Sequence, residues 1–112
     1  MESATVLTFP PFRLDPANAQ LWRDSQLIPL RPKPFAILRY LAAHPGQLVT
    51  KEELLKAVWS ETYVSEGFLS TYMRDLRAVL GDDPKVPRFI ETVPLRGYRF
   101  IAPLTTTQSK EL

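Results

Sequence analysis

Hydroxyl and guanidinium side chains gather in one short segment of the chain, at Ser70, Thr71, Arg74 and Arg77. Arg74 follows Thr71 by three residues and Ser70 by four, so the three side chains lie on one face of an α-helix. Arginine is the commonest reader of the O6 and N7 atoms of guanine, and small neighbours let a helix enter a groove deeply. On spacing alone, the simpler interpretation is that both arginines are ordinary solvated charges. The opposite face is an apolar stripe of Leu69, Met73, Leu76 and Leu80.

A second candidate group follows near the C-terminus. RFIETV and YRFIAPL have the composition of two strands, and the PLRG between them contains a glycine, so the segment predicts a β-hairpin. Arg96 and Gly97 would lie at its tip, where glycine permits a positive φ and arginine can reach into a narrow minor groove. Arg99 is either phosphate-facing or solvated.

Other chemistry has little support. The chain has no cysteine and a single histidine, His44, which excludes thiolate nucleophiles, Cys-ligated metals and a histidine pair. Glu52 and Glu53, like Asp82 and Asp83, are adjacent in sequence, so helix-start and loop solvation explain them better than catalysis. The four glycines are scattered and form no phosphate-binding loop. We therefore expect no enzyme, no cofactor and no metal.

The composition indicates one folded domain. Of 112 residues, 45% are hydrophobic and 11% aromatic, enough to bury a core. No apolar run approaches the roughly 20 residues that cross a bilayer, and the start lacks a signal peptide, so we expect a cytoplasmic protein. The net charge of +2 is too small to indicate a nucleic-acid partner by itself.

Short strands should precede the helices. Residues 6–30 alternate apolar runs with turn residues, and the turns are expected at 15–18 and 24–25. Pro10 and Pro11 cannot donate ladder hydrogen bonds, so the first strand should be an edge strand or be broken there. Residues 104–112 have little apolar content and predict a disordered tail or a linker to a further domain.

Helical periodicity begins after residue 31. The first helix is expected over about 32–44, with prolines tolerated in its first turn. The second should span 51 to about 59, since Thr50 and Glu53 form a capping box and Val49 and Leu54 a hydrophobic staple. The third should span 65–80, capped by Ser65 and ended by Gly81.

This order of elements is that of a winged helix-turn-helix, and two motifs make the resemblance specific. They are V-x-x-x-x-L-x-x-x-M-R-x-L-R-x-x-L from Val64 and I-E-T-V-x-x-R-G-Y-R-F from Ile90. Over about residues 8–102 the chain resembles the OmpR/PhoB-type DNA-binding domain of bacterial transcriptional regulators. The resemblance implies an α+β fold over residues 6–103, in which a four-stranded N-terminal antiparallel sheet precedes three helices and a hairpin wing.

The resemblance also implies a function, which is sequence-specific binding of double-stranded DNA in transcription regulation. The recognition helix, 65–80, would enter the major groove and the wing, 89–101, the minor groove. The family usually carries this domain after a receiver domain, in two-component signalling. Here the domain begins at residue 1, which looks more like regulators of the CadC/ToxR type or large cytoplasmic regulators.

The family pattern implies particular contact residues. Positions 72, 74, 75 and 77 are contact positions, but Asp75 departs from the basic residue often found there and could pair with Arg74 or repel a phosphate. The family often has an arginine where this chain has Pro94, so Arg96 would take over that role. Thr92 and Tyr98 match phosphate-contacting positions, or else they are a strand threonine and a packed tyrosine. The candidate DNA-binding residues are Ser70, Thr71, Tyr72, Arg74, Arg77, Thr92, Arg96 and Tyr98.

The family also implies partners. A second copy would bind head-to-tail on direct-repeat half-sites, and the loop 59–64 would contact RNA polymerase. Trp59 and Phe68 flank that loop, and core packing is the simpler explanation for both. A winged-helix protein-interaction module remains the alternative function, because the net charge is modest and Asp75 is acidic.

Overall fold

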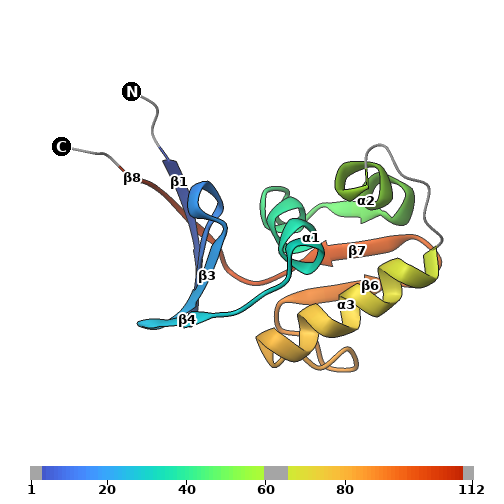
Figure 1. Cartoon of the computed structure of the whole chain (residues 1–112). Coiled ribbons are helices and arrows are strands. Elements are labelled where there is room, and N and C mark those ends of the chain that lie inside the picture. Colours follow the sequence, from blue (N-terminus) through green and yellow to red (C-terminus); the bar gives the residue numbers. More distant parts are fainter. Residues whose placement is uncertain (1–3, 60–65, 110–112) are drawn as a thin grey trace. The chain divides into compact units, whose positions relative to one another are not determined.

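A computed structural model describes residues 4–59 and 66–109 of the chain. The chain divides into two compact units, Met1–Leu30 with Pro103–Leu112 and Arg31–Ala102 (Figure 1). The first contains a β-sheet, and the second contains three helices with a smaller sheet.

The sheet of the first unit confirms the predicted short antiparallel strands. Its order is β4-β3-β2-β1-β8, and all neighbours pair antiparallel. Apolar side chains alternate along the strands, which buries Leu7, Phe9, Phe12 and Leu14. The N-terminal strands are β1 (Ala4–Phe9), β2 (Phe12–Asp15), β3 (Gln20–Arg23) and β4 (Gln26–Ile28).

Both predicted turns are present. The Asp15 carboxylate accepts hydrogen bonds from the backbone amide of Asn18 at 3.4 Å and from its side-chain amide at 2.8 Å. This Asx-type capping closes the short 3₁₀ turn between β2 and β3. Asp24 has a φ of 54°, a left-handed conformation that aspartate tolerates, and it starts the second turn.

The C-terminal segment differs from expectation. Thr105–Ser109 forms strand β8, which pairs with β1 from Thr105↔Thr8 to Ser109↔Ala4. The prediction of a disordered tail is therefore wrong over these residues, and the sheet has five strands rather than four. β1 is consequently not an edge strand, although it ends before Pro10 as expected. The reason is that ladder hydrogen bonds use backbone groups, and β-branched threonines favour strands without an apolar pattern.

The helices of the second unit lie close to their predicted positions. They are α1 (Pro32–Ala42), α2 (Lys51–Val58) and α3 (Glu66–Leu80). The Thr50 hydroxyl accepts from the Glu53 amide at 3.0 Å, which confirms half of the capping box. The Glu53 carboxylate accepts from the Tyr40 hydroxyl at 2.5 Å. The predicted cap Ser65 and its partner Val64 lie outside the described residues.

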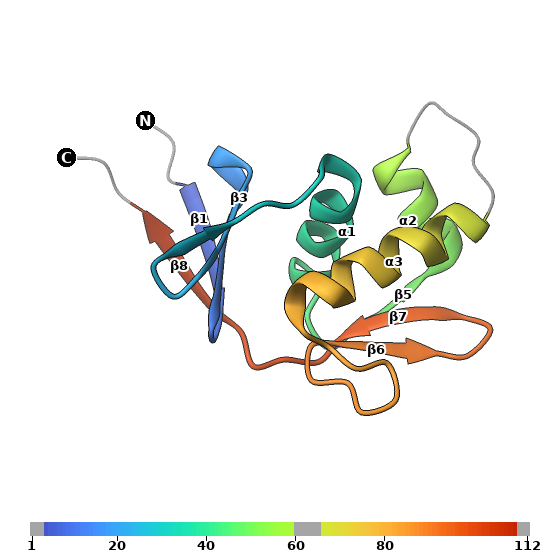
Figure 2. The ribbon, with the colours of Figure 1, turned by 60° about the horizontal axis from the view of Figure 1, so that its bottom comes forward.

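A three-stranded sheet completes this unit, in the order β5-β7-β6. β6 (Ile90–Val93) and β7 (Gly97–Phe100) form the predicted hairpin, while β5 (Leu48–Thr50) was not expected. Figure 2 shows the three helices on one side of this sheet.

The hairpin glycine serves a different purpose from the predicted one. The positive φ at the tip belongs to Leu95, at 66°, and Gly97 is not among the positive-φ glycines. A Cβ atom on Gly97 would lie 2.0 Å from the carbonyl oxygen of Val49 and 2.8 Å from Cα of Thr50. Glycine is therefore required for the close approach of β5 to β7.

Candidate nucleic-acid interface

One face of α3 is exposed among the residues of its unit that the structure describes. Ser70, Thr71 and Arg74 are exposed, as are the small residues Gly67 and Ala78. The Thr71 hydroxyl donates to the carbonyl of Gly67 at 3.1 Å, so its oxygen keeps its capacity to accept a hydrogen bond. The predicted stripe is buried on the other side, with Leu69, Met73, Leu76 and Leu80 at 0–3% exposure.

The end of α3 is fixed by its C-cap. Gly81 has a φ of 69°. Its amide donates to the backbone carbonyl of Ala78 at 3.3 Å, and the amide of Asp82 donates to the backbone carbonyl of Arg77 at 2.9 Å. These two bonds make a Schellman motif, as the predicted glycine stop implies.

Asp82 then links the end of α3 to the hairpin. The expectation that it is a solvated loop residue is therefore wrong. Its carboxylate accepts from the backbone amides of Arg88 at 2.7 Å, Phe89 at 3.2 Å and Ile90 at 2.9 Å. Its exposed fraction is only 7%, and these three bonds replace the water that burial removes. The sequence signal was an aspartate directly after the helix-ending glycine.

Arg77 is buried, unlike the exposed candidates on α3. It is 9% exposed, and its Nη2 atom donates to the carbonyl of Ile90 at 2.9 Å and to Oγ1 of Thr92 at 2.6 Å. Its Nε atom is buried without a hydrogen-bond partner among the described residues. Helical spacing predicts that this arginine lies on the shoulder of the exposed face, but the hairpin covers that shoulder. Arg77 therefore links α3 to the wing.

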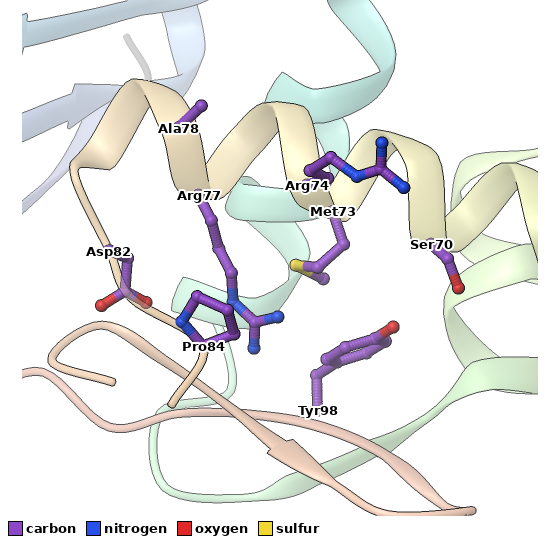
Figure 3. A pocket seen from close by; sticks show the side chains of 8 residues that line it. All are labelled: Ser70, Met73, Arg74, Arg77, Ala78, Asp82, Pro84 and Tyr98. Atoms are coloured by element: carbon purple, nitrogen blue, oxygen red, sulfur yellow. The ribbon is translucent and has the colours of Figure 1, made fainter. Parts of the chain in front are cut away.

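A hollow of about 460 Å³ lies between α3 and the hairpin. Figure 3 shows Arg77 extending from α3 towards the hairpin and Tyr98 extending from β7 towards α3. Tyr98 is 5% exposed, and the Arg77 guanidinium lies 5.8 Å from its ring centroid. Arg74 and Ser70 line the same hollow from the exposed side of the helix.

The tip of the hairpin presents a cation to solvent. Arg96 is exposed beside Leu95, which is 95% exposed. Two backbone hydrogen bonds fix Arg96: its amide donates to the carbonyl of Val93 at 3.0 Å, and its carbonyl accepts from the amide of Lys51 at 3.1 Å. Thr92, on β6, is also exposed. The arginine side chain is thus carried on an anchored turn.

Tyr72 lies between two side chains from other elements. Its ring centroid is 5.6 Å from that of Trp59, and the Arg31 guanidinium carbon lies 5.6 Å from the Tyr72 ring centroid. Arg31 also forms an ion pair with Asp75. Asp75 therefore pairs with an arginine at the start of α1, not with Arg74 as considered from the sequence.

The residues that flank the connection between α2 and α3 differ in exposure. Trp59 is half-buried, and the Lys33 ammonium lies 5.3 Å from its ring centroid. Phe68 is 54% exposed, so core packing does not account for it. The intervening residues 60–65 lie outside the described part of the chain, and with them most of the predicted polymerase loop.

Residues 25–100 match the family described as "Transcriptional regulatory protein, C terminal". The chain belongs to this family. It is a family of transcription regulators and not of enzymes, and the N-terminal sheet, three helices and hairpin are its winged-helix fold. Within the described residues, no helix is long and apolar enough to cross a membrane.

Relatives include the transcriptional regulatory protein KdpE of Mycobacterium tuberculosis, with 38% identity over 92 residues. That alignment covers 81% of this chain and 41% of KdpE. The transcriptional activator CadC of Escherichia coli is 30% identical over 97 residues, which cover 86% of this chain and 19% of CadC. The chain thus spans less than half the length of these relatives.

Solved structures agree with this membership. The DNA-binding domain of Klebsiella pneumoniae RstA, crystallised in complex with the RstA box, superposes with a TM-score of 0.77 at 30% identity. The match covers 86% of this chain and 96% of that domain. The response regulator DrrB of Thermotoga maritima, an OmpR/PhoB homologue, gives 0.79 at 33% identity over 87% of this chain and 44% of DrrB.

Proposed function

We propose that this winged-helix domain binds a specific sequence of double-stranded DNA and thereby regulates bacterial transcription. The observation that carries the proposal is the open face of α3 around Arg74. The hairpin that packs against α3 also has an exposed arginine, Arg96, at its tip. Small exposed residues let this face enter the major groove, and a charged tip beside it can reach the adjacent minor groove. The family membership and the DNA complex of RstA support it.

The candidate residues divide into contacts and supports. Ser70, Thr71 and Arg74 offer hydrogen-bonding groups to base edges or phosphates, and Arg96 enters the minor groove. Thr92 is exposed and can contact a phosphate. Arg77 and Tyr98 are buried, so we assign them mainly to holding the wing against α3. Tyr72 is half-buried between Trp59 and Arg31, so only the edge of its ring is offered to DNA.

Further partners belong to the same proposal. The free domain is a monomer that binds as two head-to-tail copies on direct-repeat half-sites in the bacterial cytoplasm. RNA polymerase is contacted through residues 59–64, near the exposed ring of Phe68. Sedimentation of the free domain and footprints on the selected site test the stoichiometry. A stable free dimer at micromolar concentration contradicts the first statement, and a single protected half-site contradicts the second.

A titration against duplex DNA at several salt concentrations tests the central claim. Neutralising phosphates releases counterions, so the affinity should fall steeply with salt, and one selected sequence should bind far more tightly than a scrambled duplex. Weak binding with little salt dependence and no sequence preference contradicts DNA recognition. That result favours the protein-interaction alternative, because docking between proteins releases few counterions.

A further inference from the structure

Asp75 is an acidic residue beside the exposed face of α3, the face that we propose to meet DNA. It follows Thr71 by four residues and Phe68 by seven, so the three side chains form one column on the helix surface. Its side chain is 39% exposed. An unpaired carboxylate here would be repelled by the phosphates of a bound duplex. The residue therefore needs a compensating charge or a positive role.

Arg31 supplies the compensating charge from another element. It is the N-cap residue of α1, and its carbonyl accepts from the Phe35 amide at 3.0 Å, which fixes its backbone. Its guanidinium carbon lies 5.6 Å from the centroid of the Tyr72 ring, and its Nη2 atom donates to Oδ2 of Asp75. The Tyr72 ring is itself supported by Trp59 at 5.6 Å. The carboxylate is thus oriented by a chain of three side chains.

Stability alone does not explain this arrangement. The paired side chains are 66% and 39% exposed, and water screens an ion pair so strongly at that exposure that it contributes little to folding. The second carboxylate oxygen, Oδ1, has no hydrogen-bond partner among the described residues. It remains an acceptor beside Thr71 and Arg74 on the surface that meets the bases.

We propose that Asp75 reads a cytosine in the major groove by accepting a hydrogen bond from its N4 amine. Arg31 is the positioning residue that orients the carboxylate and cancels its charge. A carboxylate matches this base because the cytosine edge presents only a donor in the major groove. Guanine and thymine present acceptors there, and adenine places its N7 acceptor beside its N6 donor, where it would repel a carboxylate. The inference rests on the DNA binding proposed above and adds a base preference that arginines do not supply.

Selection from a pool of duplexes with a randomised core, followed by titration of the selected site and its single-base variants, tests the proposal. The wild-type chain should prefer cytosine at one position by roughly 5- to 100-fold. Asp75→Ala should lose that preference while it keeps the preference that depends on Arg74. Glu52→Ala removes an exposed carboxylate from α2 and is the matched control for charge.

Arg31→Met retains the aliphatic part of the side chain and leaves Asp75 uncompensated. It should weaken binding to every sequence and reduce the cytosine preference, while Arg39→Met, a matched change of an exposed arginine on α1, should keep the preference. The double variant Arg31→Met/Asp75→Ala should show no further loss of preference beyond Asp75→Ala, because the two residues act as a unit. Thermal unfolding of each variant checks that the fold is retained.

The outcomes separate this inference from the proposed function. If the wild type enriches no sequence, the DNA-binding proposal itself fails. If the wild type enriches a site and Asp75→Ala keeps every base preference, only the role of Asp75 is overturned. A uniform gain of affinity in Asp75→Ala also overturns it, because the carboxylate would then act only as a repulsive charge.

Discussion

The guanidinium of Arg77 on α3 donates a hydrogen bond of 2.6 Å to the Oγ1 atom of Thr92 on β6. The helix proposed for the major groove is therefore bonded directly to the strand that carries the wing. Three residues earlier on the same helix, Arg74 is exposed. Arg77 therefore supports the wing, whereas Arg74, on the same helix, remains available for DNA.

Replacing the two arginines should separate stability from DNA binding. Arg77→Ala removes a buried guanidinium that donates two hydrogen bonds to β6. It should lower the free energy of unfolding by about 2–4 kcal/mol. Arg74→Ala should change it by less than about 0.5 kcal/mol and instead weaken binding by about 1–3 kcal/mol. Chemical denaturation and DNA titration measure the two effects.

The Arg74 variants also show which DNA group is contacted. A bidentate contact with guanine predicts that Arg74→Ala relaxes preference at one base pair and that Arg74→Lys does not fully restore it. A phosphate contact predicts a uniform loss and a salt slope smaller by about one unit. Unchanged affinity on every duplex contradicts both.

Arg96→Ala should weaken binding most where the flanks of the site are rich in A·T pairs. A narrow minor groove concentrates negative potential, so a cation on the anchored hairpin tip gains most there. Titrations on duplexes that differ only in their flanks measure the effect. An equal loss on G·C-rich flanks would show that the wing does not enter the minor groove.

Asp82→Ala should destabilise the domain by about 2–4 kcal/mol, because it leaves three backbone amides around a buried site without their acceptor. Asp83→Ala is the matched control, since that residue is exposed and, among the described residues, its carboxylate accepts only from the Lys85 amide, at 2.9 Å. Denaturant unfolding compares the two. Equal stabilities for both variants would exclude an anchoring role for Asp82.

Gly97→Ala should destabilise the domain by about 2–4 kcal/mol, because its Cβ would overlap the backbone of β5. Gly46→Ala offers a control with a different cause: its φ of 77° strains alanine, but no atom lies within 4 Å of the added Cβ. Its cost should be about 1–2 kcal/mol. A smaller loss for Gly97→Ala than for Gly46→Ala would refute the close-approach explanation.

The pKa of Tyr40 is raised above 10.0, chiefly because its hydroxyl donates to the Glu53 carboxylate, with burial and the negative charge of Glu53 adding to the effect. Since the folded pKa exceeds the unfolded one, this bond stabilises the fold below pH 10 and is lost as the pH rises through the folded value. Glu53→Gln should lower the pKa of Tyr40, whereas Glu52→Gln should not. An NMR titration, with the Tyr40 signal assigned from Tyr40→Phe, measures it.

The sequence by itself determined the three helices, the hairpin and the family. Local signals decided these features: Thr50 before Glu53, Gly81 after the apolar stripe, and the two motifs that begin at Val64 and Ile90. Caps, periodicity and turn residues act within a few positions of one another, so they can be read along the chain.

Tertiary structure alone decided which side chains remain available on the surface. Helical periodicity places Arg77 and Asp75 on opposite shoulders of the exposed face, but only the packing of the hairpin shows that Arg77 is covered. Likewise, only the approach of α1 brings Arg31 to Asp75, 44 residues away. Strand β8 depends on its pairing with β1, at the other end of the chain. These contacts join residues far apart in sequence, and no local pattern encodes which distant groups will meet.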